Sequence, residues 1–355
     1  MGRSTLLSSL LALLLLTPAC PGPGGEGGGD GGSDGGALPD GGSDGGAETA
    51  CDDPVPAGRV TLPQDDGSHA EPTEWWYWTG HLDTAEGRYF GFEFAFFLQD
   101  TPGGRGSMVH HALTDLEDGT FHHTSGLELG VPPEVPGGFD LALNGQTMVG
   151  GGGHDVLHGE VDGYLLDLRV DAIKRPVLQH GVGYVDYPFG GYTYYYSRER
   201  MSASGTVTLP DGTVLPVTGT SWFDHQWGPL GDAIDLGWDW FALQLDDDRE
   251  IMIFVVRDLS GDLLVGGSLT GADCETTEIG PSDFSITPKR TWTSPNGDQA
   301  TYPLGWTITV FDETFEVEPV MDEQEVDAMF FWYWEGAATV SGDATGRAYI
   351  ELTGY

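Results

Sequence analysis

The sequence predicts an all-β protein whose short antiparallel strands form a sandwich or a barrel. Apolar residues alternate with polar or small residues in many short segments, which is the pattern of a half-buried strand. The pattern is clearest in YFGFEFAFFLQ, where one face carries Phe90, Phe92, Phe94, Phe96 and Leu98. Turn signals such as PDG at 210–212 separate neighbouring segments. No segment keeps a helical stripe over three turns, apart from a weak one in MDEQEVDAM at 321–329.

The same alternation recurs along the chain. It marks candidate strands at 163–170, 205–209, 241–245, 251–256, 306–310 and 348–355. Their close spacing, with turn residues between them, predicts meanders of antiparallel strands. The chain from about residue 59 onward is therefore predicted to be nearly all β.

Composition limits the size of the fold and the class of partner. The 355 residues, of which 39% are hydrophobic and 11% aromatic, suffice for one large domain or two of ordinary size. The 14 basic residues are outnumbered by 56 acidic ones, so the formal net charge is -42. This charge repels phosphate backbones and anionic lipid surfaces, and we expect no nucleic-acid partner.

The first residues predict export. Arg3 precedes the apolar run LLSSLLALLLL, which is too short to span a bilayer and is typical of a secretory signal peptide. The run ends in LTPAC, which resembles a bacterial lipobox, although Thr17 stands where leucine is usual. A lipid on Cys20 would anchor an extracytoplasmic protein to the membrane of a bacterial envelope. The alternative is simple cleavage after TPA and secretion.

Residues 21–57 predict a disordered linker rich in Gly and Asp. The repeated GGSDGGA contains G-x-S-x-G, but the nucleophile elbow of hydrolases needs a strand before the serine and a helix after it. If Cys20 carries lipid, Cys51 and Cys274 remain as an even pair in an oxidising compartment. A disulfide between them would connect the end of the linker to the second half of the chain. The alternative is that Cys274 is an unpaired loop thiol.

The stretch EWWYWTGHL places aromatic and ionisable side chains together. As a strand, it would carry Glu74, Trp76, Trp78 and Leu82 on one face and Trp75, Tyr77, Thr79 and His81 on the other. Core packing accounts for the aromatic side chains. It does not account for a buried carboxylate, which must find hydrogen-bond donors or shift its pKa. We therefore include Glu74 and His81 among the candidate ligand-binding residues.

A second stretch, TSWFDHQWG at 220–228, repeats this chemistry. Its alternation places Phe223, His225 and Trp227 on one face, and Trp222, Asp224 and Gln226 on the other. Ten residues later GWDWF adds Trp238 and Asp239, and FFWYWEG ends in Glu335. Acidic residues beside aromatic ones in all of these stretches indicate a site as well as a core.

These motifs, with YYYSRERMSASGTV at 194–207 and the closing YWEGAATVSGDATGRAYIELTGY, together resemble the carotenoid 1,2-hydratase and AttH-like family of lipocalin-like proteins. The resemblance extends from about Val60 to Tyr355. It implies two consecutive lipocalin-like antiparallel β-barrels, which we place at 58–228 and 229–355. It also places the DHQWG stretch near their junction, where its residues would line a substrate cavity.

The resemblance also implies a chemistry. Hydratases of this family protonate a terminal carbon–carbon double bond of a polyene and let water capture the cation. By this comparison Asp224 or Asp239 would be the acid, His225 would position or deprotonate water, and Trp227 and Trp238 would face the cation. Further ligand contacts are expected from Glu74, Trp76, Trp78 and His81. Gln226 departs from the family pattern, in which an acid is common.

We expect a large apolar small-molecule partner, a polyene, terpenoid or lipid, and no cofactor. A carrier that binds such a ligand without turnover is the main alternative, and a secreted hydrolase is another. In the enzyme hypothesis we expect Asp224, His225 and Asp239 to converge on one pocket, whereas in a carrier they would point separately into core and solvent.

No metal site is predicted. The three cysteines lie far apart in the sequence, and the HH pairs at 110–111 and 122–123 would point to opposite faces of their strands. We expect these histidines to be solvated, and we expect His154 and His158 to lie in a glycine-rich loop.

Overall fold

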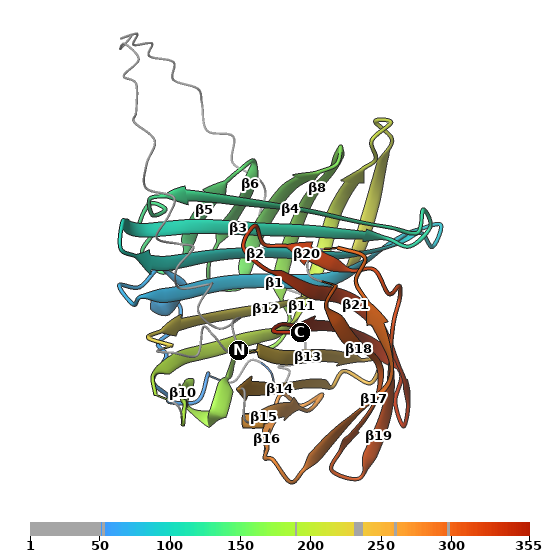
Figure 1. The fold of residues 1–355 in the computed structure, drawn as a ribbon. Helices are drawn as coiled ribbons and strands as arrows, with labels where there is room; N and C mark the ends of the chain where they lie inside the picture. Colours follow the sequence, from blue (N-terminus) through green and yellow to red (C-terminus); the bar gives the residue numbers. More distant parts are fainter. Residues whose placement is uncertain (1–50, 52–53, 189, 231–236, 259–260, 297–298) are drawn as a thin grey trace, which may run out of the picture.

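The structure, a computed structural model, describes residues 51, 54–188, 190–230, 237–258, 261–296 and 299–355. It confirms the all-β prediction, because two antiparallel sheets curl into barrel-like bodies whose strands hold about two thirds of these residues (Figure 1). The described helices are the 3₁₀ turns η2 (Gln64–Asp66) and η3 (Gln179–Gly181). The stretch 321–329 is not helical but contains the short strand β20 (Glu325–Asp327). Within the described part of the chain, we find no helix long and apolar enough to cross a membrane.

The first sheet has twelve strands in the order β4-β3-β2-β1-β12-β11-β8-β7-β6-β5, with β9 and β10 also paired to β11. Its strands are β1 (Thr73–Thr84), β2 (Tyr89–Thr101), β3 (Gly104–Asp115), β4 (Thr120–Leu129), β5 (Phe139–Leu143), β6 (Gln146–Gly150), β7 (His154–Val161), β8 (Tyr164–Ala172), β9 (Val177–Leu178), β10 (Tyr184–Asp186), β11 (Tyr192–Thr208) and β12 (Val214–Gly228). Strands β1 and β12 are far apart in the sequence but adjacent at the centre of this sheet.

The second sheet has ten strands in the order β16-β15-β14-β13-β22-β21-β19-β18-β17, with β20 paired to β21. Its other strands are β13 (Gly237–Leu245), β14 (Glu250–Asp258), β15 (Gly261–Thr270), β16 (Thr276–Ile279), β17 (Phe284–Thr293), β18 (Thr301–Val310), β19 (Glu313–Pro319), β21 (Trp332–Gly342) and β22 (Gly346–Leu352). The last strand of the first sheet thus ends at Gly228, and the second sheet begins at Gly237.

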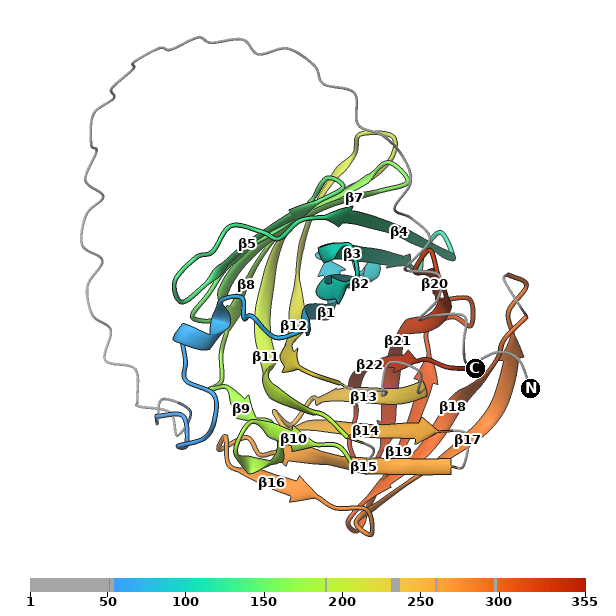
Figure 2. The ribbon, with the colours of Figure 1, turned by 60° about the vertical axis from the view of Figure 1, so that its left-hand side comes forward.

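The two sheets form two separate curved bodies (Figure 2). Each encloses its own apolar core. In the first, the inward residues of β1 and β2 are those that the period-two pattern predicted, among them Trp76, Trp78, Phe92 and Phe94, all fully buried. The second core is built around aromatic residues such as Trp306 and Trp334. The alternation in sequence therefore decides which side chains enter each core.

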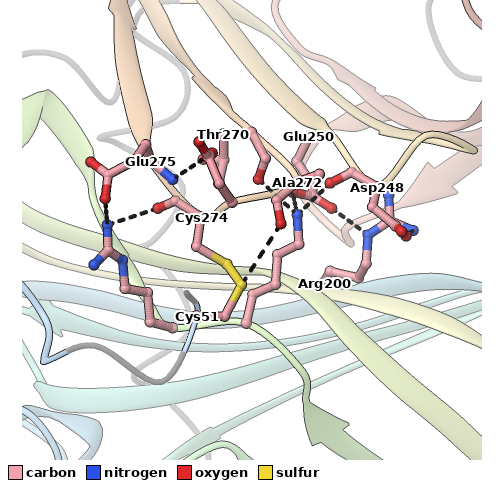
Figure 3. Close-up of a disulfide and its surroundings, with 12 residues drawn as sticks. Cys51, Arg200, Asp248, Glu250, Thr270, Ala272, Cys274 and Glu275 are labelled. Atoms are coloured by element: carbon pink, nitrogen blue, oxygen red, sulfur yellow. Dashed lines mark hydrogen bonds and ion pairs between the residues drawn. A yellow bond between two sulfur atoms is a disulfide. The ribbon is translucent and has the colours of Figure 1, made fainter. Parts of the chain in front are cut away.

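The outward faces of the two sheets pack against each other. An apolar cluster at this junction joins Tyr77 and Trp222 of the first sheet to Trp240 and Met252 of the second. The Cys51–Cys274 disulfide, with Cα atoms 5.2 Å apart, joins the N-terminal segment to the loop between β15 and β16 (Figure 3). Of the two alternatives that the sequence left open, the structure shows the disulfide.

The N-terminal segment is more ordered than predicted. Residues 1–50, with the signal sequence, Cys20 and most of the linker, lie outside the described residues. Cys51 and residues 54–57, assigned to the disordered linker, are nevertheless placed against the folded body, because the disulfide holds Cys51 and Val55 packs on the first core. The segment then passes through η2 to β1.

Candidate functional site

Glu74 lies inside the first barrel and is fully buried. It is the second residue of β1 and is paired with Trp227 of β12, while Trp76 is paired with His225. Because opposite residues of paired strands project to the same face, β1 and β12 bring Glu74, Trp76, His225 and Trp227 together. The structure therefore assembles four of the residues nominated from the two aromatic stretches.

His225 forms a hydrogen-bonded pair with this carboxylate. Its Nε2 lies 3.0 Å from Oε1 of Glu74, and since a carboxylate only accepts, Nε2 carries the proton. The imidazole ring stacks on Trp76 at 4.5 Å and lies 4.7 Å from Trp227 and 5.5 Å from Tyr196. Among the described residues its Nδ1 has no hydrogen-bond partner, although it is buried. A neutral His225 therefore presents a free lone pair within an aromatic cage.

His69 completes the site from outside the strands. Its Nδ1 donates to Glu74 Oε1 at 2.8 Å, and its backbone N–H donates to Oε2 at 2.9 Å. The ring lies flat on Trp227, with centroids 3.9 Å apart and planes 2° from parallel. Its side chain is 20% exposed, so His69 connects the buried Glu74 to solvent. We did not predict this residue, because its segment between η2 and β1 carries no strand or motif signal.

The hydrogen bonds determine the charge of Glu74 and His225. Burial would raise the pKa of Glu74, but the hydrogen bonds from His225 and His69 outweigh it and hold that pKa below its usual value. Burial lowers the pKa of His225, and the bond to Glu74 opposes this only in part. Near neutral pH the pair is therefore a carboxylate beside a neutral imidazole.

A buried ion pair packs beside the aromatic cage that Trp76, Tyr196 and Trp227 form around His225. Arg198 of β11 donates to both oxygens of Asp66 in η2, at 2.8 and 3.0 Å, and the Tyr196 hydroxyl donates to the same carboxylate. Asp66 also accepts the backbone N–H of Gly152, and its carbonyl accepts the Trp76 indole N–H at 3.1 Å. These contacts fix the segment that carries His69 and orient the ring that stacks on His225.

His69, Glu74 and His225 are also a set that could hold a metal ion, because their ligand atoms lie within 4.8 Å of one another. Both oxygens of Glu74 already accept hydrogen bonds, and Nη2 of Arg105 lies 3.4 Å from Oε2. A divalent cation would have to displace these donors and would be repelled by the guanidinium group. The geometry favours the hydrogen-bonded form.

Asp224 lies outside this site. It neighbours His225 in β12 but projects to the junction between the sheets, where it accepts hydrogen bonds from Tyr195 at 2.6 Å, Ser197 at 2.5 Å and Trp222 at 2.8 Å. Burial raises its pKa to about 6, although these three bonds oppose the shift. The alternation of side chains along a strand separates it from His225.

Asp239 and Trp238 also lie elsewhere. Asp239 pairs with Arg257 at 2.6 Å and accepts a hydrogen bond from Tyr355 at 2.9 Å, at one end of the second core. Trp238 packs at the junction. Strands β12 and β13, which carry Asp224 and Asp239, belong to different sheets. The expectation that Asp224, His225 and Asp239 converge on one pocket is therefore wrong.

Two nominated ligand contacts face different environments. Trp78 points into the first barrel and donates its indole N–H to Asp155 at 3.1 Å. His81 points to the junction, where its Nδ1 lies 2.7 Å from the Tyr89 hydroxyl. A pocket of about 490 Å³ lies beside the N-terminal segment and reaches Arg198, but none of the nominated residues lines it.

His110 and His111 correct the prediction of solvated side chains. His110 and His111 are buried, because β3 is covered on both faces. His110 contacts Tyr333 of the second sheet, and His111 stacks on Phe94 in the first barrel. His154 and His158 lie on strand β7 and not in a loop.

Comparisons with known proteins agree with this architecture. A family model described as AttH-like matches residues 53–355. A crystal structure of an AttH protein from Nitrosomonas europaea is 30% identical, with a TM-score of 0.77 over 85% of this chain and 98% of that chain. Kievitone hydratase from Nectria haematococca shares the fold at 20% identity, with a TM-score of 0.69 over 82% of this chain and 91% of its own. No curated protein matches in a sequence comparison. Since the family model covers most of its length, the chain belongs to the AttH-like family.

Proposed function

We propose that this protein is a hydratase that adds water to a carbon–carbon double bond of a large apolar molecule, a polyene, terpenoid or lipid. The observation that carries the proposal is the buried Glu74–His225 pair, whose free Nδ1 lies within a cage of aromatic rings. The name of kievitone hydratase, which shares the fold, supports the reaction class. We also propose, from the signal sequence and Cys20, that the protein acts outside the cytoplasm on a membrane anchor.

The pair can supply both proton transfers. The imidazolium form of His225 protonates one carbon of the double bond, and the π electrons form the new C–H bond. Water attacks the resulting carbocation at the neighbouring carbon, and Nδ1 of the now neutral His225 takes the proton that this water loses. The net change is the addition of one water, and the imidazolium is regenerated.

Two features of the site oppose the cost of burying the charged states of this cycle. Glu74 is held ionised and accepts a hydrogen bond from Nε2, so it stabilises the imidazolium and fixes the tautomer that exposes Nδ1. The rings of Trp76 and Trp227 beside His225 can stabilise positive charge at the imidazolium, an interaction of about 2 kcal/mol or more when water is excluded. His69, the exposed member of the site, provides a proton route to solvent through Glu74.

Isotope incorporation tests the proposal. Purified protein is incubated in ¹⁸O-labelled water with acyclic polyenes, terpenoids and unsaturated lipids, and both labelled alcohol and retained ligand are measured by mass spectrometry. We expect Glu74→Gln and His225→Asn to lower turnover by ~10² to 10⁴ while ligand retention survives. The matched controls Glu117→Gln and His154→Asn change exposed residues. Wild-type protein that retains ligand without incorporating label would contradict the hydratase proposal and favour a carrier that binds the ligand without turnover.

A further inference from the structure

The junction between the sheets contains a layer of acidic and phenolic side chains with no part in the proposed reaction. They alternate with the core residues of their strands and so project outward from both barrels. The first sheet contributes Tyr77 from β1, Glu93 from β2 and His110 from β3, and the second contributes Tyr333 and Glu335 from β21 and Tyr349 and the half-buried Glu351 from β22. We call these seven residues the junction cluster.

Hydrogen bonds of the junction cluster connect the two sheets. The Tyr77 hydroxyl donates to Oε1 of Glu335 at 2.6 Å. The Tyr333 hydroxyl lies 2.9 Å from Nδ1 of His110 and 3.5 Å from Oε1 of Glu93. These bonds join residues more than 200 positions apart, so they depend on the packing of one sheet on the other.

The carboxyl groups of the cluster lack compensating charge. Within the described ranges, no lysine or arginine forms an ion pair with Glu93, Glu335 or Glu351. Oε2 of both Glu93 and Glu335 is buried without a hydrogen-bond partner, as are Nε2 of His110 and the Tyr349 hydroxyl. At the rim of the junction, by contrast, a carboxylate has its cation: Arg347 pairs with Asp83 at 2.6 Å. Uncompensated carboxylates are costly in such surroundings, whereas neutral carboxylic acids are tolerated.

Burial and mutual repulsion keep these groups protonated. Burial, with the neighbouring Glu351, raises the pKa of Glu93 to about 8, and burial raises that of Glu351 to about 7. The pKa of Glu335 is raised for the same reasons. His110 supplies no positive charge, because burial lowers its pKa to about 3. Asp224 of β12 adds negative charge beside Glu351 as it ionises.

We propose that the junction cluster is a proton-operated latch that holds the two barrels together while Glu93, Glu335 and Glu351 are protonated and loosens when they ionise. A protonated carboxyl can donate one hydrogen bond, which the orphaned oxygens and nitrogen can accept. Ionisation removes these donors and places like charges in a buried layer with no cation to offset them. Separation of the sheets then admits water to the charged groups, and the Cys51–Cys274 disulfide keeps the barrels tethered.

The sign of the pH dependence follows from the direction of the shifts. The pKa values in the folded state lie above the ordinary 4.5 of glutamic acid. The stability they contribute is therefore complete below about pH 4.5 and is lost as pH rises through 7 and 8. We expect the latch to loosen between pH 7 and 9, whereas acid should close it.

Measurements on the full mature protein from pH 5.5 to 9.5 test the latch. Binding of a hydrophobic dye and the radius of gyration from X-ray scattering should both rise with a midpoint between pH 7 and 9, because opening exposes Trp222 and Trp240. Circular dichroism should not change, since both barrels stay folded. The triple variant Glu93→Gln/Glu335→Gln/Glu351→Gln cannot ionise there and should abolish the transition or move it upward by at least one pH unit. Glu117→Gln should behave like wild type.

Two results would overturn the latch: a wild-type protein with no transition up to pH 9.5, or a triple variant whose transition matches that of wild type. If the triple variant does not fold, Glu93→Gln alone should still raise the midpoint, because it removes the larger of the two defined pKa shifts and therefore much of the free energy that drives opening. An unchanged midpoint in that variant counts against the latch. Neither readout involves turnover, so the result does not depend on the proposed hydratase activity.

Discussion

Trp76 and Tyr77 are neighbours in β1, yet their side chains lie on opposite faces of the first sheet. Trp76 stacks on His225 at 4.5 Å inside the first barrel, whereas the Tyr77 hydroxyl donates to Glu335 at 2.6 Å at the junction. One strand thus forms part of the wall of the candidate active site and part of the contact between the sheets. Changes at the junction can therefore reach the site through this strand.

The proposed reaction predicts an acidic pH optimum. The active form needs the imidazolium of His225, whose pKa lies below the usual 6.5, and the carboxylate of Glu74, whose pKa lies below 4.5. kcat/KM should therefore fall about tenfold per pH unit above the His225 pKa and fall again below the Glu74 pKa. A pH–rate profile checks this. Activity that rises from pH 5 to a plateau above 7 would instead identify neutral His225 as the base that starts the reaction.

Replacement of the two aspartates should not abolish turnover. Asp224 lies at the junction and Asp239 at one end of the second core, so Asp224→Asn and Asp239→Asn should keep activity close to wild type. Glu74→Gln should instead lower turnover by ~10² to 10⁴. Initial rates per folded protein, measured in the isotope assay, make the comparison. A loss in Asp239→Asn as large as that in Glu74→Gln would show that the reacting centre lies elsewhere.

The buried Asp66–Arg198 pair should be essential for stability. Arg198→Met leaves the Asp66 carboxylate buried without its cation, at a cost of about 3 to 5 kcal/mol in the free energy of unfolding. Adding Asp66→Asn removes the uncompensated charge and should recover part of the loss. Urea denaturation of both variants measures the interaction energy between Asp66 and Arg198. If the single and the double variant are equally destabilised, the carboxylate finds another donor when Arg198 is absent.

Removal of the disulfide should destabilise the protein without changing its fold. Cys51 and Cys274 are 223 residues apart, so their bond restricts a long loop of the unfolded chain. Cys51→Ser/Cys274→Ser should lower the free energy of unfolding by about 2 to 5 kcal/mol. In reductant, the free energy of unfolding of the wild-type protein should approach that of the variant. If reductant does not change the stability of the wild-type protein, the bond contributes little.

Lipidation of Cys20 is a prediction from the sequence alone, since this residue lies outside the described ranges. The mature protein should begin at an acylated cysteine and partition with membranes, and Cys20→Ser should release it to the soluble fraction. Intact-mass spectrometry of the mature N-terminus decides the question. An unmodified N-terminus in a membrane-free protein would leave secretion as the remaining route.

The strands and their faces could be predicted from sequence, because alternation is a local property. Phe92 and Phe94 were assigned to one face, and the separation of Trp76 and Trp78 from Tyr77 and His81 was also correct. The choice of a barrel, and the order of two barrels, came from the resemblance to a family. A pattern of period two describes one strand at a time and does not choose its partners.

The site was predictable only in part. The sequence by itself determined that Glu74 would share a face with Trp76, and His225 with Trp227, since these pairs are two residues apart in a strand. Only the tertiary structure decided that the two faces meet, that His69 closes the site, and that Asp239 faces a different core. Those outcomes depend on strand pairing across about 150 residues and on packing between sheets, and such long-range contacts leave no periodic mark in the sequence.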